Sequence, residues 1–232
     1  MVLPSAKQRH TANWSKLLKS HQIRFKENWL LKVTISAFSI FWIFMAIRPL
    51  DWKVWLVENT LLVSGIILLV WTYRILPLTN VSYILIAAFL AMHAYGGHFS
   101  YQFTPVDDWM KKILHTDRGY YDRIVHFAFG LFIAFPVREA VLYVLKMRHA
   151  GQYVVTFAFI VAASGLFELL EMWAAVLFDP KLAAKYIGMQ GDVFDSHKDM
   201  TMSLIGVVLA LGLFGIQRRI GHKLSRSRSS MK

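Results

Sequence analysis

Six apolar runs, each close to the length of a membrane-spanning helix, constrain the fold of this chain more than any other feature. A helix needs about 20 predominantly apolar residues to cross the hydrocarbon core of a bilayer. The chain has 232 residues, of which 56% are hydrophobic and only 17% are charged, so one soluble core could not hide its apolar side chains. We therefore predict an all-α fold, a polytopic membrane bundle of six transmembrane helices. The expected spans are Trp29–Ile47, Val54–Tyr73, Val81–Gly96, Asp122–Lys146, Gln152–Phe178 and Asp192–Ile216.

The charged residues divide the chain into three parts and predict its orientation. Residues 1–28 form a basic amphipathic arm, residues 29–217 the transmembrane domain, and residues 218–232 a basic tail that we expect to be disordered. Basic residues gather in the arm, in the tail and in two turns between spans, so the positive-inside rule predicts both termini on the cytoplasmic side. We expect the arm to lie on the anionic membrane surface and expect no nucleic-acid partner.

The acids and histidines of the last four predicted spans collect at the outer ends of these spans. Glu168 and Glu171 lie about 60° apart on one helix face, and Asp195 and Asp199 share a face of the last span. A carboxylate in the apolar part of a bilayer is costly unless it faces the protein interior, a partner or water. We therefore expect one outward-facing polar pocket shared by four helices. The absence of cysteine excludes thiol chemistry and cysteine metal sites there.

Carboxylates and imidazoles on facing helices are typical ligands for divalent ions in helical bundles. The leading hypothesis is therefore a metal-dependent hydrolase that acts on a membrane lipid or lipid-linked head group. Its general base would be Glu168, with Glu171 as a ligand or orienting group. The predicted catalytic residues are Glu168, Glu171 and Asp192, the predicted metal ligands are His98, His126, Asp195 and Asp199, and the predicted substrate-binding residues are Arg118, Tyr121, Arg123 and Gln190.

Two other classes of protein fit the same residues. The carboxylates could serve an ion or small-solute carrier, although polar residues are sparse in the inner half of the predicted bundle. The cluster could also be a buried salt-bridge network in a non-catalytic module, with Glu168 and Glu171 paired to Arg118 or Arg123. Asp192 and Asp195 could simply cap the last helix. The metal, the substrate and the oligomeric state stay open at this stage.

Several short blocks occur in an order that resembles one known family. These blocks are Tyr95-Gly96-Gly97-His98, Tyr121-Asp122-Arg123 with His126, Arg138-Glu139, Phe167–Glu171, and Gln190–Asp195 followed by Asp199. Over about residues 80–216 the chain resembles the YjdF-like family of bacterial inner-membrane proteins, whose function is unknown. It departs from the family pattern at Met172 and at Ser196-His197. The resemblance implies a multi-pass protein of the bacterial inner membrane and leaves its activity open.

Overall fold

The computed structural model describes residues 17–18, 23–76, 78–147, 149–177 and 192–229. Over these ranges the regular structure is helical, which confirms the all-α prediction. Five helical segments there are long and apolar enough to cross a membrane. They are α3 (Trp52–Thr72), α4 (Asn80–His98), the segment Tyr121–Tyr143, α8 (Ala150–Leu177), and Asp195–Ile220 of α10 (Asp195–Ser229). The first predicted span is the shorter apolar helix α2 (Trp29–Met45).

Polar side chains set the starts of α2, α3 and α4. Asn28 caps α2 by accepting a hydrogen bond from the Leu31 amide. Asp51 does the same for α3, and Thr79 caps α4 through the amide of Ser82. A side-chain oxygen at this position satisfies an amide that has no partner within the helix. With these caps, α3 begins two residues before its predicted start and α4 begins one residue before its predicted start.

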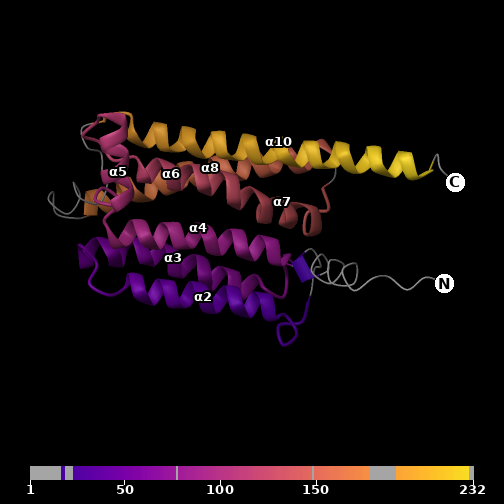
Figure 1. Cartoon of the computed structure of the whole chain (residues 1–232), viewed down its shortest axis with the longest axis horizontal. Coiled ribbons are helices and arrows are strands. Elements are labelled where there is room, and N and C mark those ends of the chain that lie inside the picture. Colours follow the sequence, from indigo (N-terminus) through magenta and orange to yellow (C-terminus); the bar gives the residue numbers. More distant parts are fainter. Residues whose placement is uncertain (1–16, 19–22, 77, 148, 178–191, 230–232) are drawn as a thin grey trace.

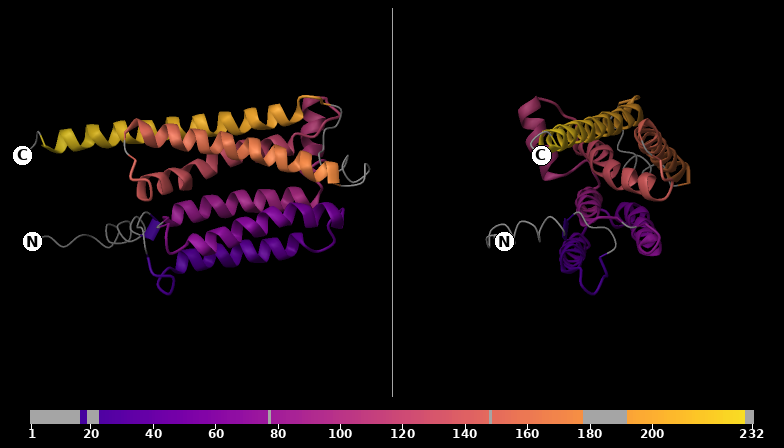
Figure 2. Two further views of the ribbon diagram at one scale, coloured as in Figure 1. Left: turned by 180° about the vertical axis from the view of Figure 1, so that it is seen from behind. Right: turned by 90° about the vertical axis from the view of Figure 1, so that its right-hand side faces the viewer.

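The helices form two groups that lie side by side (Figures 1 and 2). Helices α2, α3 and α4 form one group, and α6, α7, α8 and α10 form the other. Helix α4 joins them through its packing on α6, η1 and α7. The short helix α5 (Pro105–Leu114) lies at one end of the bundle, which we call the α5 end (Figure 1). Helix α2 begins, and α10 terminates, at the other end. The predicted orientation in the membrane remains a prediction.

The fourth predicted span is one helical unit with an irregular centre. It consists of α6 (Tyr121–Ala128), a π-helical turn η1 (Phe129–Ile133) and α7 (Ala134–Tyr143). Pro136 has no amide hydrogen, and its ring crowds the carbonyl four residues earlier, within η1. The wider turn therefore lies directly before the turn of helix that contains the proline. It also brings Gly130 of η1 against the backbone of α10 at Ser203.

The interior is small, and the apolar side chains mostly face outward, as expected for a protein surrounded by lipid. A buried cluster of Ala134, Ile160, Val207, Ala210 and Phe214 holds the second group of helices together. Outside it, many large apolar side chains of the spans are exposed, which in a chain of this class is the lipid-facing surface.

Hydrogen bonds also hold the two groups of helices together at the end opposite α5. The buried Glu139 of α7 accepts hydrogen bonds from the Thr79 amide at 2.9 Å, the Thr79 hydroxyl at 2.8 Å and the Ser82 hydroxyl at 2.6 Å. The guanidinium of Arg138 lies over the ring of Phe214, with 4.7 Å to the ring centroid. Arg138-Glu139 therefore joins α7 to the start of α4 and to α10.

Candidate functional site

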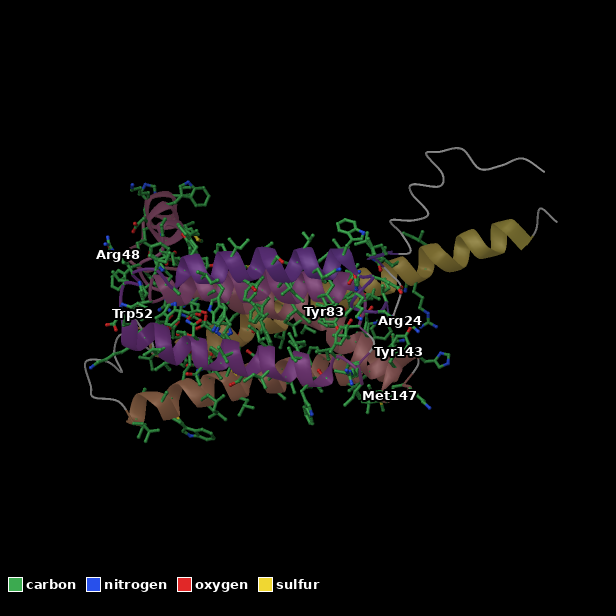
Figure 3. All side chains as sticks on the ribbon, turned by 90° about the horizontal axis from the view of Figure 1, so that it is seen from below. Arg24, Arg48, Trp52, Tyr83, Tyr143 and Met147 are labelled. Carbon is green, nitrogen blue, oxygen red and sulfur yellow. The ribbon has the colours of Figure 1, made fainter. Side chains whose placement is uncertain are left out.

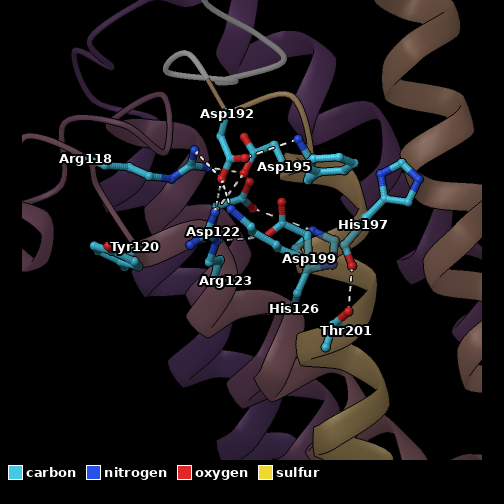
Figure 4. Close-up of polar contacts among 12 residues, drawn as sticks. Arg118, Tyr120, Asp122, Arg123, His126, Asp192, Asp195, His197, Asp199 and Thr201 are labelled. Atoms are coloured by element: carbon cyan, nitrogen blue, oxygen red, sulfur yellow. Dashed lines mark hydrogen bonds and ion pairs between the residues drawn. The ribbon is translucent and has the colours of Figure 1, made fainter.

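Three helices bring acids, histidines and arginines together at the α5 end of the bundle (Figure 4). Arg123 and His126 belong to α6, Glu168 to α8, and Asp199 to α10. Arg118 comes from the segment between α5 and α6. These helices are distant in sequence, so their meeting is a property of the fold.

Two arginines and two aspartates form the outermost part of the cluster. Arg118 Nη1 lies 3.1 Å from Asp192 Oδ2, and its other terminal nitrogen pairs with Asp195. Arg123 Nη2 lies 2.8 Å from Asp192 Oδ2 and 3.4 Å from Asp195 Oδ1. Lys198 donates to Asp192 at 2.6 Å. Hydrogen bonds from Lys198 foremost, and from the Phe194 amide and Arg123, lower the pKa of Asp192 to about 2. The network ties the start of α10 to α6.

His126 lies one helical turn deeper, between two carboxylates. Its Nε2 is 3.3 Å from Glu168 Oε1 and 3.6 Å from Asp122 Oδ1. The other side of the ring faces Ser203, whose hydroxyl lies 3.4 Å from Nδ1 and donates to the His126 carbonyl at 3.0 Å. Since Ser164 of α8 donates to Ser203, a short polar chain crosses the three helices. A histidine held between acids can accept and return a proton.

A second histidine group, formed by Glu58, His93 and Tyr101, lies on the α3–α4 side. His93 Nε2 is 3.1 Å from the Glu58 carbonyl oxygen and 3.7 Å from its carboxylate, and Tyr101 Oη is 2.5 Å from His93 Nδ1. Burial raises the pKa of Tyr101 well above 10, and the Glu58 carboxylate adds to the effect. The Tyr101 hydroxyl therefore stays protonated at neutral pH.

The two glycines of the Tyr95–His98 block make this group possible. A Cβ atom on Gly96 would lie 2.6 Å from the Tyr101 ring, and one on Gly97 would lie 3.2 Å from Glu58 Cβ. Gly96 thus seats the tyrosine ring, and Gly97 lets α3 approach α4 beside the buried acid. Ser100 and Tyr101 both have left-handed backbones, with φ of 52° and 56°. That costly turn folds the ring back onto α4.

A pocket of about 240 Å³ connects the two histidine groups. Its polar end is formed by His93, Tyr101, Asp122 and His126. Apart from Ser164, the rest of its wall is apolar, and it comes from α3, α4, α6, η1 and α8. The apolar lining residues include Leu61, Leu62, Phe89, Leu90, Phe129 and Phe167. The apolar part of the pocket could therefore hold a hydrocarbon, and acid–base side chains line its polar end.

Asp107 fixes the segment that carries Arg118. Its carboxylate is fully buried and accepts from the amides of Tyr120 at 2.6 Å and Tyr121 at 2.8 Å. The Thr104 hydroxyl also donates to it, at 2.8 Å. Since two consecutive backbone amides bind one carboxylate, the start of α6 has a defined position. Neither the residue spacing nor a motif in the sequence predicts this structural role of Asp107.

Most of the predicted site residues are joined by these contacts, but some are not. His98 contacts the Met45 carbonyl at 2.8 Å and the Phe99 ring, neither of which belongs to the predicted ligand set. Tyr121 donates its hydroxyl to the Met92 carbonyl at 2.9 Å. Glu171 is partly buried near Glu168, and Gln190 lies outside the described residues. The predicted site residues did not include Glu58, His93 or Tyr101, although Glu58 is visible in the sequence as an acid within an apolar run.

The described part of the chain contains no preformed metal site. No group of three histidine, aspartate or glutamate side chains among these residues is arranged to hold one ion. Asp195 pairs with both arginines, whereas His126 and Asp199 remain near other acids. Three buried carboxylate oxygens, Glu58 Oε2, Glu168 Oε1 and Asp199 Oδ1, have no hydrogen-bond partner within this part. The predicted divalent ion stays a prediction.

The fold and the cluster define a class of protein, a multi-pass helical membrane protein with a polar pocket at one end of its bundle. Residues 30–219 match the family described as "Predicted membrane protein (DUF2238)", and the chain belongs to that family. It is also 31% identical over 182 residues to Inner membrane protein YjdF of Escherichia coli (strain K12). That alignment covers 77% of this chain and 86% of the relative, so the chain is a multi-pass inner-membrane protein. No solved structure matches it significantly.

Proposed function

We propose that this protein is a hydrolase of a membrane lipid or lipid-linked head group, with its reaction centre at the polar end of the 240 Å³ pocket. The observation that carries the proposal is the continuity of an apolar wall with His126 and Asp122. A hydrocarbon chain would occupy the apolar part, because burial of apolar surface favours it there. The bond to be cleaved would then lie beside the His126–Glu168 pair.

The two histidine groups supply complementary proton chemistry. Glu168, 3.3 Å from His126, would take a proton from the attacking water, with His126 sharing the charge. The Tyr101 hydroxyl, hydrogen-bonded to His93, would donate a proton to the leaving oxygen. Water then adds across the cleaved bond, and the proton gained by Glu168 passes through solvent to the Tyr101 oxygen, which restores both groups. Asp122, 3.6 Å from His126, would orient the imidazole.

A divalent ion is part of this proposal because the acids outnumber the cations. Asp122, Glu168 and Asp199 each have a carboxylate at the cluster, while Arg118 and Arg123 are engaged mainly by the two aspartates nearest the start of α10. A buried excess of negative charge is relieved by a bound cation or by protonation. The ion would neutralise a phosphate of the head group or activate water.

The experiment incubates detergent-purified protein with polar lipids and lipid-linked phosphates, with and without a chelator, and separates the products. Glu168→Gln is expected to lower the rate at least ~100-fold, the usual loss for a removed general base. Asp108→Asn, an exposed acid on α5, is the matched control and should keep the wild-type rate. If Glu168→Gln turns over as fast as wild type, the proposed reaction centre is wrong.

Metal analysis of the same preparations tests the ion separately. We expect about one divalent ion per chain in the wild type, lost in Asp199→Asn and kept in Asp108→Asn, as bundle sites of this kind require. If the wild-type protein contains no metal and still hydrolyses lipid, the ion is not part of the mechanism and the acid–base centre remains.

A non-catalytic role is the second candidate, favoured by the paired arginines. Arg118 and Arg123 each contact both Asp192 and Asp195, an arrangement that joins the α5–α6 segment to α10 without any chemistry. On this proposal Arg123→Gln lowers stability and no lipid is turned over. A carrier would instead move its solute into sealed vesicles, which the hydrolase would not do.

A further inference from the structure

A second and larger pocket lies between α2, α3 and α4, separate from the candidate site. Its volume is about 630 Å³. Helices α2 and α3 each pack on α4, and the space between them forms the pocket. The lining is almost wholly apolar and includes Phe38, Trp42, Ile66, Leu69, Ala87 and Leu90.

The pocket is open on the side that meets lipid. Ile35 of α2 and Val70 of α3 line it, yet their side chains are 46% and 72% exposed. Both belong to apolar helices of the membrane domain, so the surroundings are acyl chains. Apolar volume of this kind, reached from the bilayer, accommodates hydrocarbon.

Polar and aromatic groups lie at one end of this pocket, and Arg74 is the cation among the lining residues that the structure describes. Arg74 lines the pocket beside the rings of Phe25, Tyr73 and Tyr83. These rings contact one another, with 6.3 Å between the first pair of centroids and 6.1 Å between the second. Tyr83 lies toward the end of the bundle opposite Arg48 and Trp52 (Figure 3).

Arg74 is exposed, and no carboxylate pairs with it in the portion of the chain that the structure describes. A guanidinium binds phosphate with paired, charge-assisted hydrogen bonds. Basic pockets between transmembrane helices bind phospholipid head groups by this chemistry. The acids of the candidate site lie at the α5 end, whereas Arg74 follows the end of α3 at the other end of the bundle (Figure 1), so these acids cannot serve as its partners.

We propose that this pocket binds one anionic membrane phospholipid, with an acyl chain between α2 and α3 and its phosphate on Arg74. The combination of an apolar, lipid-facing pocket and a single guanidinium at its end defines the ligand. Neutral lipids would fill the apolar part equally well and lack the net charge that favours Arg74.

Native mass spectrometry of the full-length protein in detergent tests the site with phosphatidylglycerol and phosphatidylcholine of identical acyl chains. Wild type should prefer phosphatidylglycerol about 10-fold, the size of one charge-assisted contact. Arg74→Gln should abolish this preference and Arg74→Lys should keep part of it. Arg48→Gln, an exposed arginine at the opposite end, should match wild type.

A second pair of variants tests the acyl-chain part of the pocket. Ala87→Trp on α4 and Ser39→Phe on α2 fill the pocket from two helices and should reduce binding of both lipids. Circular dichroism of the lipid-free variants shows whether each one folds, and one folded variant is enough for the test. An unchanged preference in Arg74→Gln, or unchanged binding in a folded filled variant, would overturn the proposal.

Discussion

Replacing Gly206 by alanine tests the tightest helix crossing beneath the candidate site. A Cβ atom there would lie 2.8 Å from the Leu131 amide nitrogen and 3.1 Å from the Gly130 carbonyl carbon, where ordinary contacts are 3.4–4 Å. It would lie closer still to the Phe127 carbonyl oxygen. All three are backbone atoms, which cannot rotate away as a side chain can. Helix α10 must therefore move from α6 and η1 by roughly 0.6 Å or more.

The cost of that movement follows from the contacts it disturbs. Overpacking of this kind costs about 1–3 kcal/mol. The Ser203 hydroxyl donates to the His126 carbonyl at 3.0 Å across the same crossing, and its loss adds about 1 kcal/mol. Alanine recovers about 0.5–1 kcal/mol through its better helix propensity. The net expectation is a free energy of unfolding lowered by about 1–3 kcal/mol.

Unfolding in mixed detergent micelles, followed by circular dichroism, measures this change. Gly212→Ala is the matched control, because it lies on the same helix and its new Cβ would meet no atom within 4 Å. We expect the control to be neutral or slightly more stable than wild type. If Gly206→Ala unfolds at the same detergent fraction as Gly212→Ala, the argument from backbone contact is refuted.

Two further changes test charged contacts at opposite ends of the bundle. The Lys198 ammonium and the other hydrogen bonds lower the pKa of Asp192 from 3.8 to about 2, so its carboxylate stabilises the folded state fully above about pH 4 and progressively less toward pH 2. The difference in Tm between wild type and Asp192→Asn should therefore shrink over that range, and a constant difference would contradict this linkage. Glu139→Gln, which weakens three hydrogen bonds at the start of α4, should cost about 1–3 kcal/mol in the same unfolding assay, while the exposed Glu27→Gln should have no measurable effect.

The spans could be predicted because the bilayer imposes a length that can be counted in the sequence. Apolar runs of about 20 residues leave few alternatives, and the caps at Asp51 and Thr79 fix where α3 and α4 begin. The first run forms a helix of only 17 residues, because the chain turns after Met45 before the run ends. Run length alone could not locate that turn.

The meeting of α6, α8 and α10 could also be predicted, but the pairing of charges within it could not. An acid within a span must avoid lipid, so Glu168 and Asp199 had to face the interior. Which acid meets which arginine depends on the rotation of each helix and on the path of the loop before α6. In the structure Arg118 and Arg123 pair with Asp192 and Asp195, whereas the sequence also allowed Glu168 as their partner.

The group of Glu58, His93 and Tyr101 shows a different limit. Glu58 and His93 lie on separate spans, and nothing in their spacing relates them. Tyr101 joins them only because two non-glycine residues adopt left-handed backbones, which local preference disfavours. Tertiary packing against Gly96 must supply the stabilisation that outweighs this cost. A sequence pattern could therefore indicate the small residues but not the ring that they receive.

For the proposed hydrolase, the balance of charge at the α5 end would determine which head groups the pocket accepts. The two arginines were expected to hold an anionic head group, but their terminal nitrogens already contact Asp192 and Asp195. The acids deeper in the cluster would repel a bare phosphate at the end of the pocket. The proposed divalent ion would shield a phosphate from these acids, so chelation should weaken binding of a phosphorylated lipid as well as its hydrolysis. A lipid with an uncharged, hydroxyl-bearing head group would bind equally well with the chelator present.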